Sequence, residues 1–229
     1  MRMARSTRIA LVAVVLGIAT GLIVFVGMAY VRTSPPTVDF ATGHRAGQAV
    51  NVHMQTVGTY GKGTHPTWVS YLIQDPKTGR WVHTTLLDVP ADTRVNFTIY
   101  QFDSGSPLRN QQVGLVQGTI GGKMSVNGKS LRLLNSYSNA GVAHTFSIPT
   151  LGVNVPLLGV SSPNLCGVAP CSTARWPHNV VRFSFVTPKA VGQYAWQCFV
   201  PCGAGWLYGN GGPMQTIGYM DGLLKVVQA

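Results

Sequence analysis

The sequence predicts an all-β domain, folded as an antiparallel sandwich, behind a single N-terminal transmembrane helix. Of the 229 residues, 27 are Gly and 14 are Pro, and only 10% are charged. This composition suits a β domain with many turns better than a helical one. From Ala49 onward, apolar segments of strand length alternate with turn residues, and no long amphipathic helix interrupts them. The length allows one sizeable domain plus an anchor.

The apolar run at residues 9–31 is the predicted membrane anchor. It contains no charged residue, and as a helix it would span about 34 Å, enough to cross the hydrocarbon core of a bilayer. Residues 1–8 carry three arginines, so they are expected to stay in the cytoplasm with the rest of the chain outside. The alternative is a cleaved signal peptide, but the run is long and no convincing small-x-small site follows it. We therefore expect a single-pass protein of the cell membrane.

The remainder of the chain divides into a linker and a domain. Residues 32–47, stiffened by Pro35 and Pro36, are the expected linker, and residues 48–229 the expected extracytoplasmic domain. Residues 101–141 are mostly Gly, Ser, Asn and Gln and are expected to form loops. The predicted strands lie at or near residues 50–57, 67–74, 80–87, 95–99, 142–148, 180–186, 193–199 and 223–227.

Charge and motifs exclude several function classes. The chain has 17 Lys and Arg against 6 acidic residues, all of them Asp, and carries a net charge of +11. The basic residues do not cluster with aromatic ones, which argues against nucleic-acid binding. A chain so poor in carboxylates loses few ion pairs on acidification, so we expect an acidic external medium (an acidophile), with compositional drift as the alternative. No Gly-x-Ser-x-Gly, His-Glu-x-x-His or phosphate-loop motif occurs, and no catalytic residue is expected.

The four cysteines form two close pairs. Outside the cytoplasm thiols are oxidised or bound to metal, so Cys166 and Cys171 are expected to form a loop disulfide. Cys198 and Cys202, followed by Met220 at the start of the last strand, form a soft set of ligands suited to copper. The alternative for this second pair is a short disulfide.

Three segments carry a resemblance to a known family. They are Val89-Pro-Ala-Asp-Thr-Arg-Val-Asn-Phe97, His144-Thr-Phe-Ser-Ile-Pro-Thr-Leu-Gly-Val-Asn154 and Gly192-Gln-Tyr-Ala-Trp-Gln-Cys-x3-Cys202. Over about residues 87–229, with a gap, the chain resembles the cupredoxin domain of subunit II of haem-copper terminal oxidases. The resemblance implies a cupredoxin-like Greek-key β-sandwich that holds a dinuclear copper centre. Such a centre takes electrons from a cytochrome c and passes them to haem in subunit I.

The resemblance also implies a set of ligands, which this chain matches only in part. The implied donors are His144, the thiolates of Cys198 and Cys202, the backbone carbonyl of Val200, and Met220. The family pattern places a second His four residues after the second Cys and a Met three residues beyond it, but Trp206 and Gly209 stand there. An insertion at 203–214 separates Cys202 from Met220, and three residues before Met220 the chain has Ile217.

Three arrangements of this site stay open. In the first, a dinuclear or altered copper centre recruits another histidine; His178 is the best placed, ahead of His44, His53, His65 and His83. In the second, copper is lost, as in relatives that oxidise quinol directly, and Cys198 and Cys202 form a disulfide. In the third, a single copper is held by His144, Cys198 and either Met220 or Met214.

The expected function is that of a subunit II-like, membrane-anchored part of a terminal oxidase. It would admit electrons if copper is bound and play a structural part if copper is lost. Expected partners are the haem-bearing subunit I, other membrane subunits, and a cytochrome c, small copper protein or quinol as donor. The loop around Trp206 and Tyr208 is an expected docking surface. The alternatives are a free-standing mononuclear copper carrier and a non-redox surface binding module.

Overall fold

The computed structural model describes residues 5–28, 34–62, 65–202 and 212–228. The chain forms two compact units, residues 1–34 and 35–229. The expected docking loop with Trp206 and Tyr208, together with Gly209, lies outside the described residues.

The first unit contains one helix, α1 (Arg5–Val26), whose side chains are all exposed. Among the described residues, α1 is long and apolar enough to cross a membrane. It begins four residues before the predicted 9–31 span, because Ser, Thr and Arg at its start are compatible with helical backbone. An N-terminal apolar helix of spanning length is therefore confirmed.

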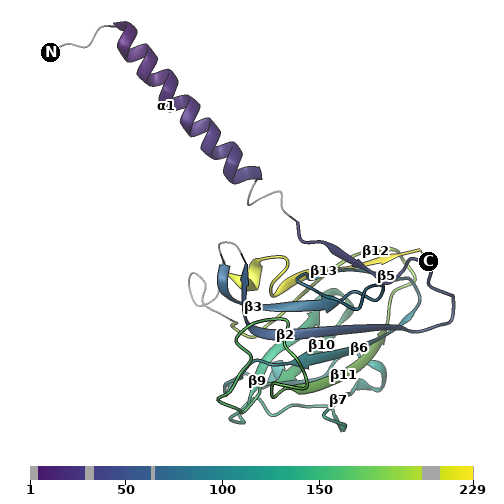
Figure 1. The fold of residues 1–229 in the computed structure, drawn as a ribbon. Coiled ribbons are helices and arrows are strands. Elements are labelled where there is room, and N and C mark those ends of the chain that lie inside the picture. The colour runs from purple at the N-terminus through teal and green to yellow at the C-terminus, as the bar shows by residue number, and fades with distance from the viewer. Residues whose placement is uncertain (1–4, 29–33, 63–64, 203–211, 229) are drawn as a thin grey trace. The chain divides into compact units, whose positions relative to one another are not determined.

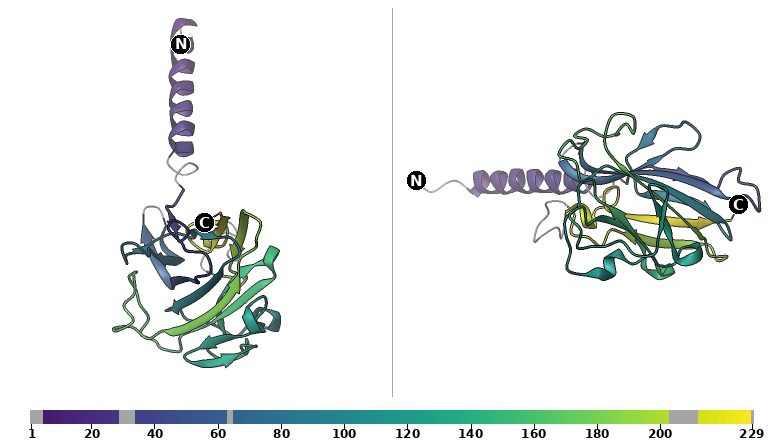
Figure 2. Two further views of the ribbon diagram at one scale, coloured as in Figure 1. Left: turned by 90° about the vertical axis from the view of Figure 1, so that its right-hand side faces the viewer. Right: turned by 90° about the horizontal axis from the view of Figure 1, so that it is seen from below.

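The second unit is a sandwich of two sheets (Figures 1 and 2). The first sheet, in spatial order, consists of β1 (Thr37–Asp39), β5 (Leu86–Pro90), β13 (Asp221–Val227), β12 (Gly192–Gln197), β9 (Val142–Ile148) and β10 (Val153–Leu158). The second consists of β4 (Trp81–Val82), β3 (His65–Gln74), β2 (Val50–Lys62), β6 (Arg94–Gln101), β11 (Asn179–Val186), β7 (Met124–Val126) and β8 (Lys129–Leu131). The predicted all-β fold is confirmed.

Strand alternation builds the core between the sheets. Along β6, Val95, Phe97 and Ile99 are buried while the residues between them are not. The ring of Phe97 stacks on Phe183 of β11, with centroids 5.0 Å apart, and lies 4.9 Å from the ring of Phe146 in the facing sheet. A period of two residues thus places one apolar face inward, as the sequence predicted.

Several features of the strands differ from the sequence expectation. β1 lies in the expected linker, and β7 and β8 lie within residues 101–141, expected to form loops. The sheets are mixed, because β1 with β5, β5 with β13, and β2 with β6 run parallel. The segment 80–87 was expected to form one strand. Instead it crosses between the sheets: β4 belongs to the second sheet and β5 to the first.

Thr85 stands at this change of sheet and explains it. Its carbonyl accepts hydrogen bonds from the Trp196 indole (3.1 Å) and the Leu223 amide (3.1 Å). Its hydroxyl donates to the Asp221 carbonyl and accepts from the Gly218 amide, both at 2.6 Å. Hydrogen bonds with these four residues therefore hold Thr85, and the chain that follows it, in the first sheet.

A disulfide joins Cys166 and Cys171, as predicted. The side chain of Gln55, in β2, binds this loop through two hydrogen bonds. Its Nε2 donates to the Cys171 carbonyl (2.8 Å), and its Oε1 accepts from the Cys171 amide (2.9 Å). Gln55 thus attaches the disulfide loop to the second sheet.

Candidate metal centre

A cluster of buried donors lies where β9 passes the end of β12. Every residue of β9 is buried, and His144 is its third residue. Cys198 directly follows β12, and its amide donates to the carbonyl of Met220, which directly precedes β13 (3.0 Å). The strand pair β12–β13 therefore fixes the start of the loop that carries both thiols.

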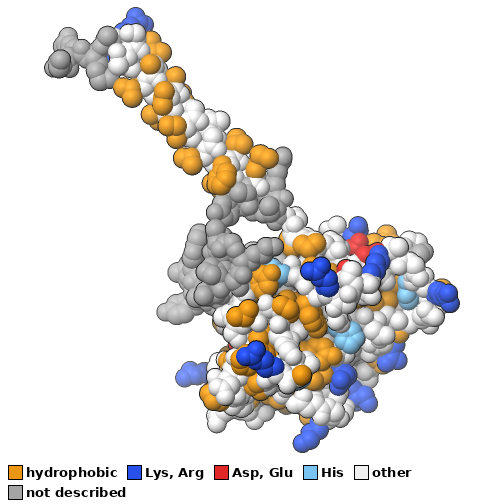
Figure 3. Space-filling model, viewed as in Figure 1, with side chains coloured by type: hydrophobic (Ala, Val, Ile, Leu, Met, Phe, Trp, Pro, Cys, Tyr) orange, Lys and Arg blue, Asp and Glu red, His pale blue; other side chains and the backbone are white. Residues whose placement is uncertain are grey.

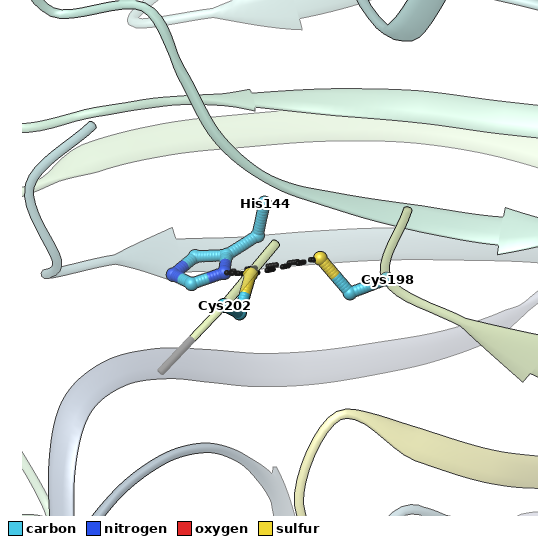
Figure 4. A group of neighbouring side chains, drawn as sticks. All are labelled: His144, Cys198 and Cys202. Carbon is cyan, nitrogen blue, oxygen red and sulfur yellow. Dashed lines mark hydrogen bonds between the residues drawn. The ribbon is translucent and has the colours of Figure 1, made fainter. Parts of the chain in front are cut away.

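The three side chains converge on one point (Figure 4). Nδ1 of His144 lies 2.9 Å from Sγ of Cys202 and 4.0 Å from Sγ of Cys198, and the two sulfurs are 3.2 Å apart. All three side chains are at most 4% exposed. The two thiols are free rather than bonded to each other. An imidazole nitrogen and two thiol sulfurs this close, shielded from water, form a donor set suited to a soft metal.

A carboxylate orients the imidazole. Oδ2 of Asp103, in the loop after β6, lies 3.0 Å from Nε2 of His144. Nε2–H donates to this oxygen, so Nδ1 is the ring nitrogen that faces the sulfurs. Asp103 is itself held, because its Oδ1 accepts the Ser104 amide (2.8 Å) and its own amide donates to Gln101 (3.1 Å).

The electrostatics favour a charged pair of sulfurs beside a protonated ring. Burial opposes protonation of His144, but the hydrogen bond to Asp103 and the contact with Cys198 outweigh it and raise its pKa to about 9. Burial also opposes ionisation of Cys198, but hydrogen bonds from Cys202 and His144 hold its pKa well below 9.0. Burial and the charge of Cys198 raise the pKa of Cys202. Because Nδ1 lies nearer to Cys202, we assign the single negative charge to the sulfur pair rather than to one atom.

Backbone oxygens complete the surroundings. The carbonyl oxygen of Val200 lies 3.5 Å from Sγ of Cys198, and that of Ala143 lies 3.6 Å from Sγ of Cys202. The Met220 side chain is fully buried in the same apolar core as both cysteines. The sequence expectation named Val200 and Met220 but not Ala143.

The other histidines proposed from the sequence are placed elsewhere. Nδ1–H of His178 donates to the Trp176 carbonyl (2.9 Å), and the ring packs near that of Phe102. His83 contacts Ser70 (2.7 Å), and His53 stacks on Tyr100. Nε2 of His44 is buried and has no hydrogen-bond partner among the described residues, and the side chain of His65 lies outside them. Among the described residues, His144 is therefore the one imidazole in the cluster.

Met214, the second thioether considered from the sequence, lies in the short 3-10 helix η5 (Pro213–Gln215). Its side chain is half-buried against the main core, and its carbonyl accepts a hydrogen bond from Gln197 (2.7 Å). The structure therefore holds Met214 by its backbone near β12.

Sequence reasoning missed three residues that shape the cluster. Besides Asp103, these are Thr145, whose amide donates to Sγ of Cys198 (3.4 Å), and Tyr71. The Tyr71 hydroxyl donates to the Thr145 carbonyl (3.0 Å), and its ring meets those of His144 and Trp196 edge-on. No motif marks Tyr71, in β3, or Asp103, in the loop after β6, because both meet His144 only in the fold.

The comparisons with known proteins concern the fold. No family model matches the sequence, and no curated protein matches it. The copper protein rusticyanin is 16% identical, with a TM-score of 0.31 and 86% of each chain covered. Rusticyanin from Thiobacillus ferrooxidans is 14% identical, with a TM-score of 0.31, 86% of this chain and 85% of that chain covered. A chain of a haem-copper terminal oxidase dimer is 13% identical, with a TM-score of 0.30, 98% of this chain and 100% of that chain covered. At TM-scores near 0.3, function has to be argued from the site itself.

Proposed function

We propose that this chain is a membrane-anchored cupredoxin-like subunit II of a haem-copper terminal oxidase, and that it admits electrons through copper. The observation that carries the proposal is the approach of His144, Cys198 and Cys202 to within 4.8 Å of one another. Two thiols and one imidazole, all buried and unbonded to each other, have few uses other than holding a soft metal.

The residues present fit copper. His144, Cys198 and Cys202 would be its main ligands, with the Val200 carbonyl and Met220 as further donors. Copper bound here supplies one-electron redox chemistry. The chain's own part is to fix the donors: β9 is buried along its length, Asp103 orients the ring, and the Cys198 amide is tied to Met220. Donors held in this way move little when charge changes, which favours fast electron transfer.

The anchor and the partners follow from the same proposal. Helix α1 would hold residues 48–229 outside the cytoplasmic membrane, behind the linker at 32–47, with residues 1–8 in the cytoplasm. Electrons would come from a cytochrome c, a small copper protein or a quinol and pass to haem in a separate subunit. Reduction of oxygen would belong to that subunit.

One observation favours a second candidate. Only one imidazole lies in the cluster within the described residues, whereas the family's dinuclear centre uses two. A mononuclear copper carrier needing no large partner would use His144, Cys198 and Met220. Its copper content would be one per chain rather than two.

The test is the copper content of the full chain, purified in detergent and reconstituted with copper. We expect copper to bind to the wild type, and His144→Ala and Cys198→Ser to lose at least about tenfold in affinity. The variant His178→Asn should keep the wild-type stoichiometry, because the ring of His178 packs near Phe102 instead. A protein that binds no copper, or equal binding by all variants, would refute the copper assignment.

A second measurement separates the two candidates. Purification of the native complex from membranes should bring a haem-bearing, multi-helix subunit with this chain. Migration of the chain alone, with one copper bound, would favour the carrier.

A further inference from the structure

The outer face of the second sheet has a hollow of about 440 Å³ over β6, β11 and β7. Three cationic side chains line it: Arg94, Lys123 and Arg182. The rest of the lining consists of five polar residues, Asn96, Thr98, Ser125, Ser130 and Ser184, and four apolar ones, Phe97, Ile120, Met124 and Phe183. No acidic residue is part of this lining.

The strand register explains why these side chains share one face. Arg182 of β11 is paired with Thr98 of β6 on one side and with Ser125 of β7 on the other. Two residues further along β11, Ser184 is paired with Asn96. Because side chains point alternately to opposite faces of a strand, all of these lie on the outer side, opposite the core.

One cation in the hollow is held in place, and among the described residues no ion pair reaches the other two. Nε of Arg94 donates to Asn96 Oδ1 (3.0 Å), and Ser184 donates to the same oxygen (2.8 Å). Within the described part of the chain, four aspartates form ion pairs. These are Asp39 with Lys77, Asp88 with Lys225, Asp92 with Lys189, and Asp103 with His144. None of these carboxylates reaches Lys123 or Arg182.

The charge of Arg182 also acts on a histidine of the same sheet. Burial and the charge of Arg182 both lower the pKa of His53, whose strand β2 pairs with β6 on the same sheet. On the face drawn in Figure 3, Lys and Arg side chains are spread widely, whereas Asp side chains gather in one small patch. Among the described residues, the lining of the hollow carries three cationic side chains and no carboxylate, so its local potential is positive.

We propose that this hollow binds a tetrahedral oxyanion, either free sulfate or phosphate or the phosphate group of a small organic ester. Arginine presents a planar fork of donors that matches such an anion, and lysine adds a point charge. The hydroxyl and amide groups between them supply further donors. The volume is that of a small-molecule site. This proposal is independent of copper, because none of the hollow's residues belongs to the metal cluster.

The test is calorimetric titration of the full chain in an uncharged detergent. Sulfate, phosphate and glycerol 3-phosphate are titrated at constant ionic strength, with chloride as the reference anion. We expect 1:1 binding of at least one oxyanion. Arg182→Gln and Lys123→Gln should each weaken it at least about tenfold, since each removes a charged hydrogen-bond donor. Comparison of the three ligands shows whether the anion is free or esterified.

Arg80→Gln is the matched control, because Arg80 is an exposed arginine on the turn between β3 and β4 and carries the same charge change. It should bind the anion like the wild type. Near-ultraviolet circular dichroism of each variant confirms folding, and Ser125→Ala provides a variant without any charge change, expected to bind more weakly. The proposal is overturned if the oxyanions bind no better than chloride, or if Arg80→Gln weakens binding as much as Arg182→Gln.

Discussion

At the scale of single residues, the contact between Asp103 and His144 decides which ring nitrogen faces the two sulfurs. The space for the Asp103 carboxylate exists because residue 58 is glycine: a Cβ there would lie 2.6 Å from Oδ1 of Asp103. Gly58 and Asp103 thus act on the cluster from outside, through the orientation of one ring.

Asp103→Asn keeps the shape of this side chain and removes its charge. We expect copper affinity to fall about 10- to 100-fold, as for other partners of metal-binding histidines. A competition titration against a chelator measures it, with Asp92→Asn, an exposed aspartate, as the matched control. Gly58→Ala should shift affinity in the same direction. Unchanged affinity in both variants would show that Asp103 does not position His144.

Sequence could predict part of this cluster and not the rest. His144, Cys198 and Cys202 stand in recognisable motifs, and the fold brings them together. Asp103 is 41 residues from His144 and lies in a stretch with little apolar periodicity, so its role depends on how β6 and β9 face each other. Such a contact between sheets leaves no local pattern in the chain.

At the scale of elements, the short strand β1 brings two aspartates together. The segment expected as a linker contains β1, which pairs parallel with β5 and places Asp39 opposite Asp88. Hydrogen bonds from Thr42 and Ala41 hold the pKa of Asp39 far below its ordinary value. Burial raises the pKa of Asp88; Lys225 opposes this shift and the charge of Asp39 adds to it. β1 has only three residues and follows two prolines, so the sequence pattern was too short to predict it.

The two aspartates should therefore have opposite pH signatures. The stabilisation from Asp39 is full above its unfolded pKa and is lost as pH falls through its folded pKa, so Asp39→Asn should cost about 1 kcal/mol near pH 7 and less near pH 3.5. Burial disfavours the charged form of Asp88, so the folded wild type gains stability as pH falls through the raised pKa of Asp88. Asp88→Asn should be at least as stable as the wild type near pH 7, with the difference closing on acidification.

Urea unfolding of the full chain, followed by tryptophan fluorescence at both pH values, measures these differences. Lys77→Ala serves as a control for the ion pair with Asp39, whose atoms lie 3.2 Å apart on the surface. Parallel pH dependence in the two aspartate variants would contradict the assignment.

At the scale of the whole molecule, the cysteines fall into two chemical classes. The Cys166–Cys171 bridge holds a loop against the second sheet, and the free thiols of Cys198 and Cys202 sit in the core beside β9. The sequence predicted the Cys166–Cys171 bridge, but for Cys198 and Cys202 it left both a metal site and a disulfide open. The difference comes from the imidazole and carbonyl oxygens around the second pair, which only the fold assembles.

Alkylation of the unfolded chain distinguishes the two classes. Without reductant, and with a chelator present, we expect two labels per chain, on Cys198 and Cys202, and four labels after reduction. Mass spectrometry locates them, and a Cys198→Ser/Cys202→Ser variant should take none until it is reduced. Absence of label on the wild type before reduction would mean that the second pair is also a disulfide, the arrangement expected if copper has been lost.

The bonds made by Thr85 have a consequence for how this chain can vary. They hold both Trp196, two residues before the first free thiol, and Asp221, directly after Met220, so the segment that carries the donors is fixed at its two ends. Residues between Cys202 and Met220 can then be added or exchanged while these ends stay in place. An unusual run such as 203–214 is then tolerable in a protein that keeps its thiols and thioether in register.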